Sequence, residues 1–409
     1  MNTPNDIVRP EIETGDPPHP ETSPLTPAQM RRSLGAVIAS AFAASLTFSV
    51  CMPLLALILE RRGTSDILIG LNTAASPAGL LIFTLLMPRI VSRLGTMRAL
   101  YLGFILMIFS IVLFPVFDNV WFWFPLRFLM GIGIAIHWVV SETWINTLVD
   151  NRIRGRVMGI YVTALSAGAL VGILTLYFVG SEGTDPFFII AAVMAMGVLP
   201  LVLARDLAPG IAVHESFGLF AAMRRAPTVM TAALTDGFVM GALFAFFLIY
   251  AQRMGFDEES ALVMFIVLSV GNATLQYLVG MLADRYNKRV LLIVFAVLVA
   301  GGTTLLPFVM ATPLLLWPTL FLWGGIMGGI YTCGIALIGE RFRRDEMAAA
   351  NASFIFTYEF GHLLGPAVAG IAMAMWDPHG LIVVAVGAGL IFAVVASVRQ
   401  VRIGDNSVD

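Results

Sequence analysis

The chain has 409 residues, of which 58% are hydrophobic and only 12% are charged, and its mean hydropathy is +0.88. Soluble domains carry roughly 25% charged residues, so this chain lacks the residues needed to cover a water-facing surface. The composition excludes an ordinary cytosolic enzyme, a disordered protein and a nucleic-acid-binding protein. Cys51 and Cys333 both lie in apolar runs, which argues against a disulfide framework and a thiolate metal site.

Apolar runs of about 20 residues, the length needed to cross a bilayer core, recur along the chain. We expect twelve membrane-spanning helices, at 33–59, 67–88, 99–117, 121–146, 156–180, 187–204, 227–251, 259–282, 290–311, 314–339, 348–375 and 380–398. The predicted fold class is therefore an all-α integral membrane protein with twelve transmembrane helices.

The segments outside the spans differ in composition. Residues 1–28 hold seven of the 21 prolines and five acidic residues, so we assign 1–32 to a disordered cytoplasmic tail. This tail lacks the basic and apolar regions of a signal peptide. A polar linker is expected at 205–226 and a short cytoplasmic tail at 400–409.

The basic residues predict the orientation. With the N-terminus inside, 20 of the 24 Lys and Arg residues fall in inside segments. Arg61, Arg62 and Arg253 fall outside, and Arg127 lies within a span. The positive-inside rule then predicts that both termini lie in the cytoplasm. We expect the protein in the inner membrane of a bacterium.

The spans divide into two six-helix bundles, 33–204 and 227–399, that share sequence features at a constant offset. Ser92 and Asp284, in the loops after spans 2 and 8, are 192 residues apart. Gly168-x-x-x-Gly172 in span 5 and Gly361-x-x-x-Gly365 in span 11 are 193 apart. Two pairs at nearly one offset predict parallel, pseudo-symmetric repeats.

These features resemble the major facilitator superfamily. The loop from Gly280 to Arg289 is similar to the family signature G-x-x-x-D-R-x-G-R-R, with Asn287 in place of a Gly, and the copy at Pro88–Arg98 is degraded. Arg127 followed by Gly131-Ile-Gly133 resembles the span-4 signature, and Trp138–Glu142 is similar to the YcaD-like branch. The resemblance implies a two-half transporter that works by alternating access, and not an enzyme.

The loop signature suggests an inside gate. A carboxylate such as Asp284 could sit at a helix N-terminus of the other half, where the helix dipole favours negative charge. The alternative is an ordinary short inside turn. The residues that we assign to this gate are Asp284, Arg285, Arg289, Glu142, Arg154 and Arg156.

Ionisable residues within spans are costly and therefore candidates for function. Asp236 lies about 13 Å into span 7 with no basic residue near it in sequence. Glu359 and His362 are three residues apart in span 11, which puts them on one helix face. We predict that Asp236, Glu359 and His362 carry protons; the alternative for each is a satisfied structural contact.

Arg127 is the remaining candidate for proton coupling, since the family resemblance gives this Arg such a role. Its alternative is an Arg that reaches the outer interface near Trp121 and Trp123. His137 is interpreted as a packing residue, and Glu-x-x-His alone does not predict a metal site.

Uncharged polar residues in the spans are candidates for the substrate path, although any of them could instead join helices. They are Asn72, Asn272, Gln276, Tyr331 and Tyr358. No nucleotide-binding motif is present, so no cofactor is expected and an ion gradient must supply the energy.

The sequence thus predicts a monomeric, proton-coupled secondary transporter of a small organic solute. The apolar interior favours export, although the span-5 pattern of the family's antiporters is incomplete, with Ile173 in place of its Pro. The alternatives are proton-coupled uptake of a small metabolite, and a lipid-handling protein or intramembrane enzyme.

Overall fold

The computed structural model describes residues 25–149, 153–209, 219–343 and 346–405. These residues form thirteen α-helices and two short 3₁₀ helices, with no strand among them. The first half comprises α1 (Pro27–Arg61), α2 (Asp66–Leu94), α3 (Thr96–Leu113), α4 (Val120–Leu148), α5 (Arg154–Val179) and α6 (Asp185–Leu203). The second comprises α8 (Pro227–Arg253), α9 (Glu258–Arg285), α10 (Lys288–Val309), α11 (Pro313–Arg341), α12 (Met347–Met375) and α13 (Gly380–Asp405). The short α7 (Leu219–Arg225) precedes α8.

Eleven of these helices are long and apolar enough to cross a membrane. The two others are α7, which has only seven residues, and α12, which at 29 residues has the length but carries Glu359 and His362, and these lower its hydropathy. The all-α membrane fold is therefore confirmed, while the count of twelve spans rests on the length and position of α12.

The helix boundaries differ from the prediction at several places; α2, for example, ends at Leu94 rather than at 88. α1 begins at Pro27 rather than at 33, because Thr26 and Gln29 cap each other's backbone N–H groups. Residues 27–32 are thus helical and not part of a disordered tail. The linker contains α7, which no sequence pattern indicated, and α13 continues to Asp405. The domain bounds at 33–204 and 227–399 otherwise remain predictions.

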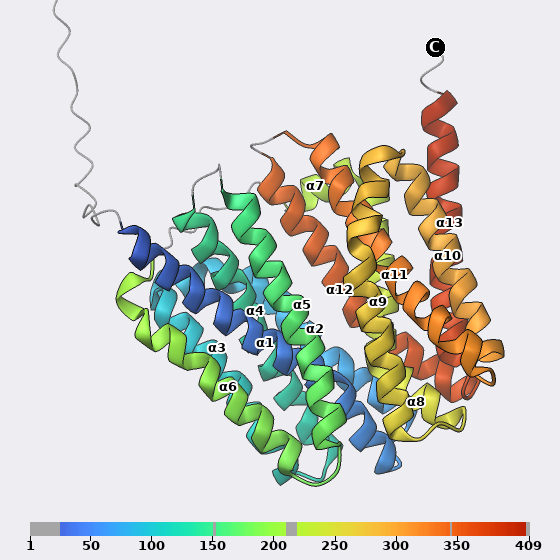
Figure 1. The fold of residues 1–409 in the computed structure, drawn as a ribbon, viewed down its shortest axis with the longest axis horizontal. Coiled ribbons are helices and arrows are strands. Elements are labelled where there is room, and N and C mark those ends of the chain that lie inside the picture. Colours follow the sequence, from blue (N-terminus) through green and yellow to red (C-terminus); the bar gives the residue numbers. More distant parts are fainter. Residues whose placement is uncertain (1–24, 150–152, 210–218, 344–345, 406–409) are drawn as a thin grey trace, which may run out of the picture.

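The helices of the two halves repeat at a constant interval. α2, α3, α4 and α5 begin at 66, 96, 120 and 154, and α9, α10, α11 and α12 begin 192 or 193 residues later, at 258, 288, 313 and 347. The helices α3, α6, α10 and α13, whose predicted spans carry no charged residue, lie on the outer flanks of the molecule (Figure 1). This placement agrees with the cost of exposing charge to lipid.

We call the end of the bundle at which α1 begins the terminal end, and the opposite one the far end. The halves meet tightly toward the far end, where α2 crosses α12 (Figure 1). A Cβ on Gly70 would lie 2.2 Å from the Pro366 carbonyl oxygen, and one on Gly370 would lie 2.4 Å from the Asp66 carbonyl oxygen. Glycine is required there because the two backbones touch.

Candidate functional site

The proton-coupling candidates of the second half lie where α8 crosses α12. Gly361 and Gly365 of α12 leave no room for a Cβ, which would lie 2.2 Å from the Leu234 carbonyl oxygen and 2.0 Å from that of Phe238. In the other direction, a Cβ on Gly241 would lie 2.6 Å from the His362 Cδ2 atom. Glycines on both helices therefore let polar side chains enter the crossing.

Glu359 and His362 form a buried pair at this crossing. The His362 Nδ1 atom lies 3.5 Å from a Glu359 carboxylate oxygen, and the residues are 3% and 4% exposed. The rings of Phe48, Phe244 and Tyr358 surround His362 at centroid distances of 5.9 to 6.2 Å. The i,i+3 spacing does bring the two side chains together.

Asp236 lies on the same crossing, one residue before Gly237, and is 4% exposed. Within the described ranges, the structure shows no hydrogen bond or ion pair for its carboxyl group. Tyr331 and Tyr358 pack edge-on, with their ring centroids 5.4 Å apart.

A cavity of about 390 Å³ lies between α2, α4 and α12. Glu359 lines it near the middle of α12, and Glu142 and Asn146 line it toward the terminal end. The sequence predicts that Glu142 pairs with Arg154 or Arg156 in a gate. In the structure Glu142 faces the cavity, and its carboxyl group has no partner among the described residues.

Arg127 is completely buried, which excludes the alternative of an Arg reaching the outer interface. Its Nη1 atom lies 3.5 Å from the Met52 sulfur, and its Nε and Nη2 atoms have no hydrogen-bond partner in the part of the chain that the structure describes. His137 is also fully buried, with its ring edge-on to Phe104 at 4.7 Å. Arg127 is thus enclosed between α1 and α4, and no ion pair with an acidic residue is described for it.

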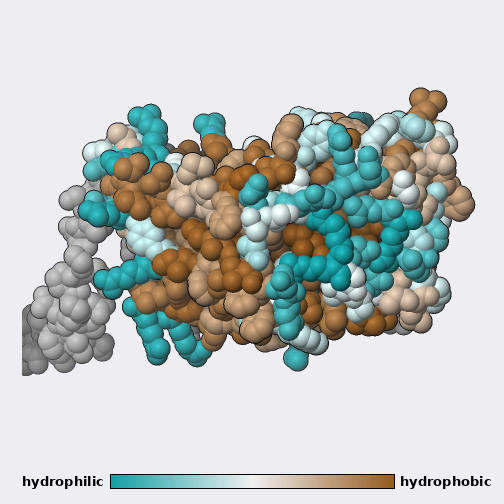
Figure 2. Space-filling view, turned by 90° about the horizontal axis from the view of Figure 1, so that it is seen from below, coloured by the Kyte–Doolittle hydropathy of each residue, from teal (hydrophilic) through white to brown (hydrophobic). Residues whose placement is uncertain are grey.

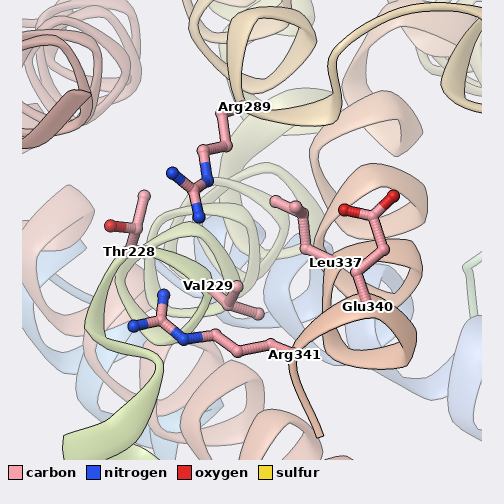
Figure 3. Close-up of a pocket in the computed structure, with 6 residues that line it drawn as sticks. All are labelled: Thr228, Val229, Arg289, Leu337, Glu340 and Arg341. Carbon is pink, nitrogen blue, oxygen red and sulfur yellow. The ribbon is translucent and has the colours of Figure 1, made fainter. Parts of the chain in front are cut away.

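Among the gate residues whose side chains the structure describes, none makes a hydrogen bond or ion pair between the halves. Asp284, Arg285 and Arg156 are exposed, and the Arg154 side chain is outside the described residues. Arg289 lines a recess within the second half, between α8, α10 and α11. Figure 3 shows the guanidinium groups of Arg289 and Arg341 turned toward the same space beside Thr228.

The remaining path candidates divide into two kinds. Asn72 is fully buried, and no hydrogen-bond partner is described for its side chain. Asn272 and Gln276 donate to the carbonyl oxygens of Gly324 and Gly325 on α11, at 3.1 and 3.5 Å. These two amides therefore join helices, although Asn272 also lines a smaller cavity between α5 and α9.

Ion pairs close the far end, and no sequence motif singled them out. Arg253 lies 2.9 Å from Glu60 and 2.6 Å from both Asp66 and Asp377. Glu60 and Asp66 belong to the first half, so Arg253 bridges the halves. Figure 2 views this end and shows groups of hydrophilic side chains among hydrophobic ones.

A second arginine repeats this arrangement by pseudo-symmetry. Arg61 is 192 residues before Arg253, and its guanidinium lies 3.6 Å from Glu258, which is 192 residues after Asp66. In each half, the arginine at the end of the first helix thus pairs with an acidic residue of the other half. That acidic residue lies in the first turn of the other half's second helix. The repeat offset in the sequence relates the two arginines and their two acidic partners, but not the pairing between the halves.

These features, two helical halves related by an internal repeat and joined at one end, define a membrane transporter. The sequence matches the Major Facilitator Superfamily over residues 37–366 and 262–403. The chain belongs to this superfamily, and it is a transporter rather than an enzyme.

Within the superfamily the chain is similar to transporters named YcaD. It is 24% identical to the "Uncharacterized MFS-type transporter YcaD" of Escherichia fergusonii over 350 residues, which cover 85% of this chain and 91% of the relative. The protein of the same name from Shigella flexneri is 25% identical over the same shares of both chains.

Solved structures share the fold at low sequence identity. The nucleoside transporter NupG is 14% identical, with a TM-score of 0.74 over 90% of this chain and 98% of that one. A bacterial homolog of the human lysosomal transporter Spinster, titled as inward-facing and unoccupied, is 15% identical with a TM-score of 0.71 over 91% and 96%. A D-xylose-proton symporter is 17% identical with a TM-score of 0.67 over 90% and 96%.

Proposed function

We propose that the protein is a proton-coupled exporter of a small organic solute in the bacterial inner membrane. The observation that carries the coupling is the group of buried carboxyl groups at the α8–α12 crossing, Asp236 without a partner in the described ranges and Glu359 beside His362. The free energy of a charged carboxyl group in a membrane protein depends steeply on access to water. Such a group can bind a proton from one side and release it to the other as the halves rock.

The orientation follows from the basic residues, 20 of 24 of which are assigned to the side of the terminal end, and this end is therefore assigned to the cytoplasm. With this assignment, the ion pairs of Arg253 and Arg61 close the periplasmic side, and Glu142 and Glu359 face the cytoplasmic half. The protein is expected to work as a monomer in the bilayer. The inside gate is expected to close when the far end opens; its residues besides Glu142 are Asp284, Arg285, Arg289, Arg154 and Arg156.

The test uses proteoliposomes with a pH-sensitive dye in the lumen and a panel of cationic, neutral and anionic solutes added outside. An antiporter admits solute and releases protons, so the lumen becomes alkaline. Asp236→Asn and Glu359→Gln should each abolish this signal, whereas Asp206→Asn, at an exposed residue outside the spans, should leave it unchanged. Proton flux that persists in both variants contradicts the coupling assignment.

The alternative is proton-coupled uptake. The similarity of the fold to that of a D-xylose-proton symporter supports it. The same experiment separates the two, because a symporter carries protons inward with the solute and the lumen becomes acidic. The sign of the lumen pH change therefore decides between antiport and symport.

A further inference from the structure

The cavity between α2, α4 and α12 has a lining that indicates the kind of solute it holds. Its volume of about 390 Å³ lies within the range of small-molecule sites. Most of the lining is apolar, from Leu80 and Leu85 of α2, Val139 of α4, and Ile355 and Phe356 of α12. Such walls favour a ligand with a large apolar body.

The charged groups of the lining have a single sign. They are the carboxyl groups of Glu142 on α4 and Glu359 on α12, and no Arg, Lys or His is among the described residues that line the cavity. Arg127 does not line it and is fully buried elsewhere in the first half. The cavity is therefore complementary to positive charge.

Both carboxyl groups are short of partners. Glu359 is 3% exposed, and the only ion pair or hydrogen bond described for its carboxyl group is with His362 at 3.5 Å, a distance longer than that of a strong charged hydrogen bond. Glu142 has neither a hydrogen bond nor an ion pair within the described ranges. A cation in the cavity would supply what both groups lack.

Aromatic side chains complete the site. Trp138 lines the cavity from α4, four residues and thus about one helical turn before Glu142, and its indole Nε1 has no hydrogen-bond partner among the described residues. Phe356 lines the cavity from α12. Aromatic faces beside carboxylates favour weakly hydrated organic cations, whose charge is spread over an apolar body.

From this geometry we propose that the cavity binds a monovalent organic cation with an apolar body, held between Glu142 of one half and Glu359 of the other. This inference rests on the proposed function, since it names the class of solute that the transporter carries. A single positive charge between the halves also attracts both of them, so binding of the cation favours closure of the terminal end. Protons on the same carboxyl groups compete with it, which is the exchange that antiport needs.

The test measures binding rather than transport, on the purified full chain in lipid nanodiscs. The probes are tetraphenylphosphonium and tetraphenylborate, which have nearly the same size and shape and opposite charge. We expect tetraphenylphosphonium to bind at least about tenfold more tightly than tetraphenylborate, a difference equivalent to about one unit of log Kd. Equal binding of both ions overturns the proposal.

Variants locate the site. Glu142→Gln and Glu359→Gln should each weaken tetraphenylphosphonium binding by about tenfold, whereas Asp206→Asn should leave it unchanged. Glu359→Asp keeps the charge and should restore most of the affinity, which separates loss of charge from misfolding. Unchanged affinity in both Gln variants, with the folded state confirmed by thermal unfolding, overturns the assignment to this cavity.

Failure of the cation site and failure of the proposed function give different results. If tetraphenylphosphonium binds but no solute moves protons, the cation site stands and the coupling fails. If neutral or anionic solutes move protons and tetraphenylphosphonium does not bind, the coupling stands and the cation site is wrong.

Discussion

The two halves cross their first and fifth long helices in the same way but fill the crossings differently. In the first half, α1 crosses α5, and Ser45 and Ser49 donate to the carbonyl oxygens of Leu165 and Ala169 at 2.7 and 2.8 Å. In the second half, α8 crosses α12, and the positions 192 residues later are Gly237 and Gly241. The two serines of the first half are therefore replaced by glycines in the second half.

The helices that cross them, α5 and α12, also differ. Glu359 and His362 of α12 correspond to Ser166 and Ala169 of α5, 193 residues earlier. The first crossing satisfies the hydroxyl groups of Ser45 and Ser49 and holds no ionisable side chain at these positions. The second crossing lacks the hydroxyl groups of all three serines and gains a carboxyl–imidazole pair. The first crossing thus acts as a packed frame, while the second crossing holds titratable groups.

The largest effect should come from filling the glycine contacts. A Cβ at Gly365 would lie 2.0 Å from the Phe238 carbonyl oxygen, and one at Gly172 would lie 2.5 Å from that of Leu46. Because backbone must move, Gly365→Ala should cost about 3 kcal/mol of stability and Gly172→Ala about 1 to 2 kcal/mol. Thermal unfolding in detergent measures both, with Gly301→Ala, where the added Cβ meets nothing within 4 Å, as the control. Equal losses at all three sites would contradict the assigned contacts.

The next largest effect should come from exchanging the residues at equivalent positions of the two crossings. Gly241→Ser introduces the serine of the first half and displaces the His362 ring, so proton-coupled flux should fall about tenfold or more. The reverse change, Ser49→Gly, removes one interhelical hydrogen bond, worth about 0.6 kcal/mol in a membrane, and should leave flux nearly unchanged. The proteoliposome dye assay measures both variants. A Gly241→Ser protein with normal flux would show that the position of His362 is unimportant.

A smaller effect concerns the arginines of the far end. Arg253 pairs closely with three carboxylates, whereas Arg61 lies 3.6 and 3.8 Å from Glu258 and Glu182. Arg253→Gln should shift the equilibrium toward an open far end by about 1 kcal/mol, roughly fivefold, and Arg61→Gln by less.

Spin labels at Ser65 and Ala311, exposed residues of different halves at the far end, should report the shift as a larger long-distance population. The salt dependence of the shift serves as an internal control, because partly exposed ion pairs weaken at high ionic strength. A stronger effect for Arg61→Gln than for Arg253→Gln would reverse the inferred order of the two clusters.

The smallest effect is at the terminal end of the second crossing, where the Arg225 guanidinium donates to the Glu346 carboxylate. This hydrogen bond lowers the pKa of Glu346 below its ordinary value of 4.5. A group whose folded-state pKa is lowered stabilises the fold above its unfolded pKa, and this stabilisation is lost as pH falls through the folded value. Unfolding midpoints measured from about pH 6 down to about pH 3 should therefore decrease less in Glu346→Gln than in the unaltered chain. Identical pH profiles would contradict this role.

Several parts of the site were predictable because they depend on local spacing. Glu359 and His362 are three residues apart on a helix, so their contact follows from helical geometry alone. The repeated Gly-x-x-x-Gly motifs indicated the internal repeat, and in the structure both lie at close helix contacts, at α1–α5 and α8–α12. The partners of Arg253 and the orientation of Glu142 toward the cavity depend on how the halves are placed, which no local pattern records.

The sequence alone determined that the chain is an all-α membrane protein, that its two parts repeat, and that few charges remain inside the spans, because bilayer thickness and the cost of buried charge act on each helix separately. Tertiary structure decided the rest. The α2–α12 and α8–α12 contacts place Glu142 and Glu359 on one cavity, enclose Arg127 apart from them, and bring Arg253 to Asp66. These groups are distant in the chain, so only the packing of helices from both halves fixes which charges meet.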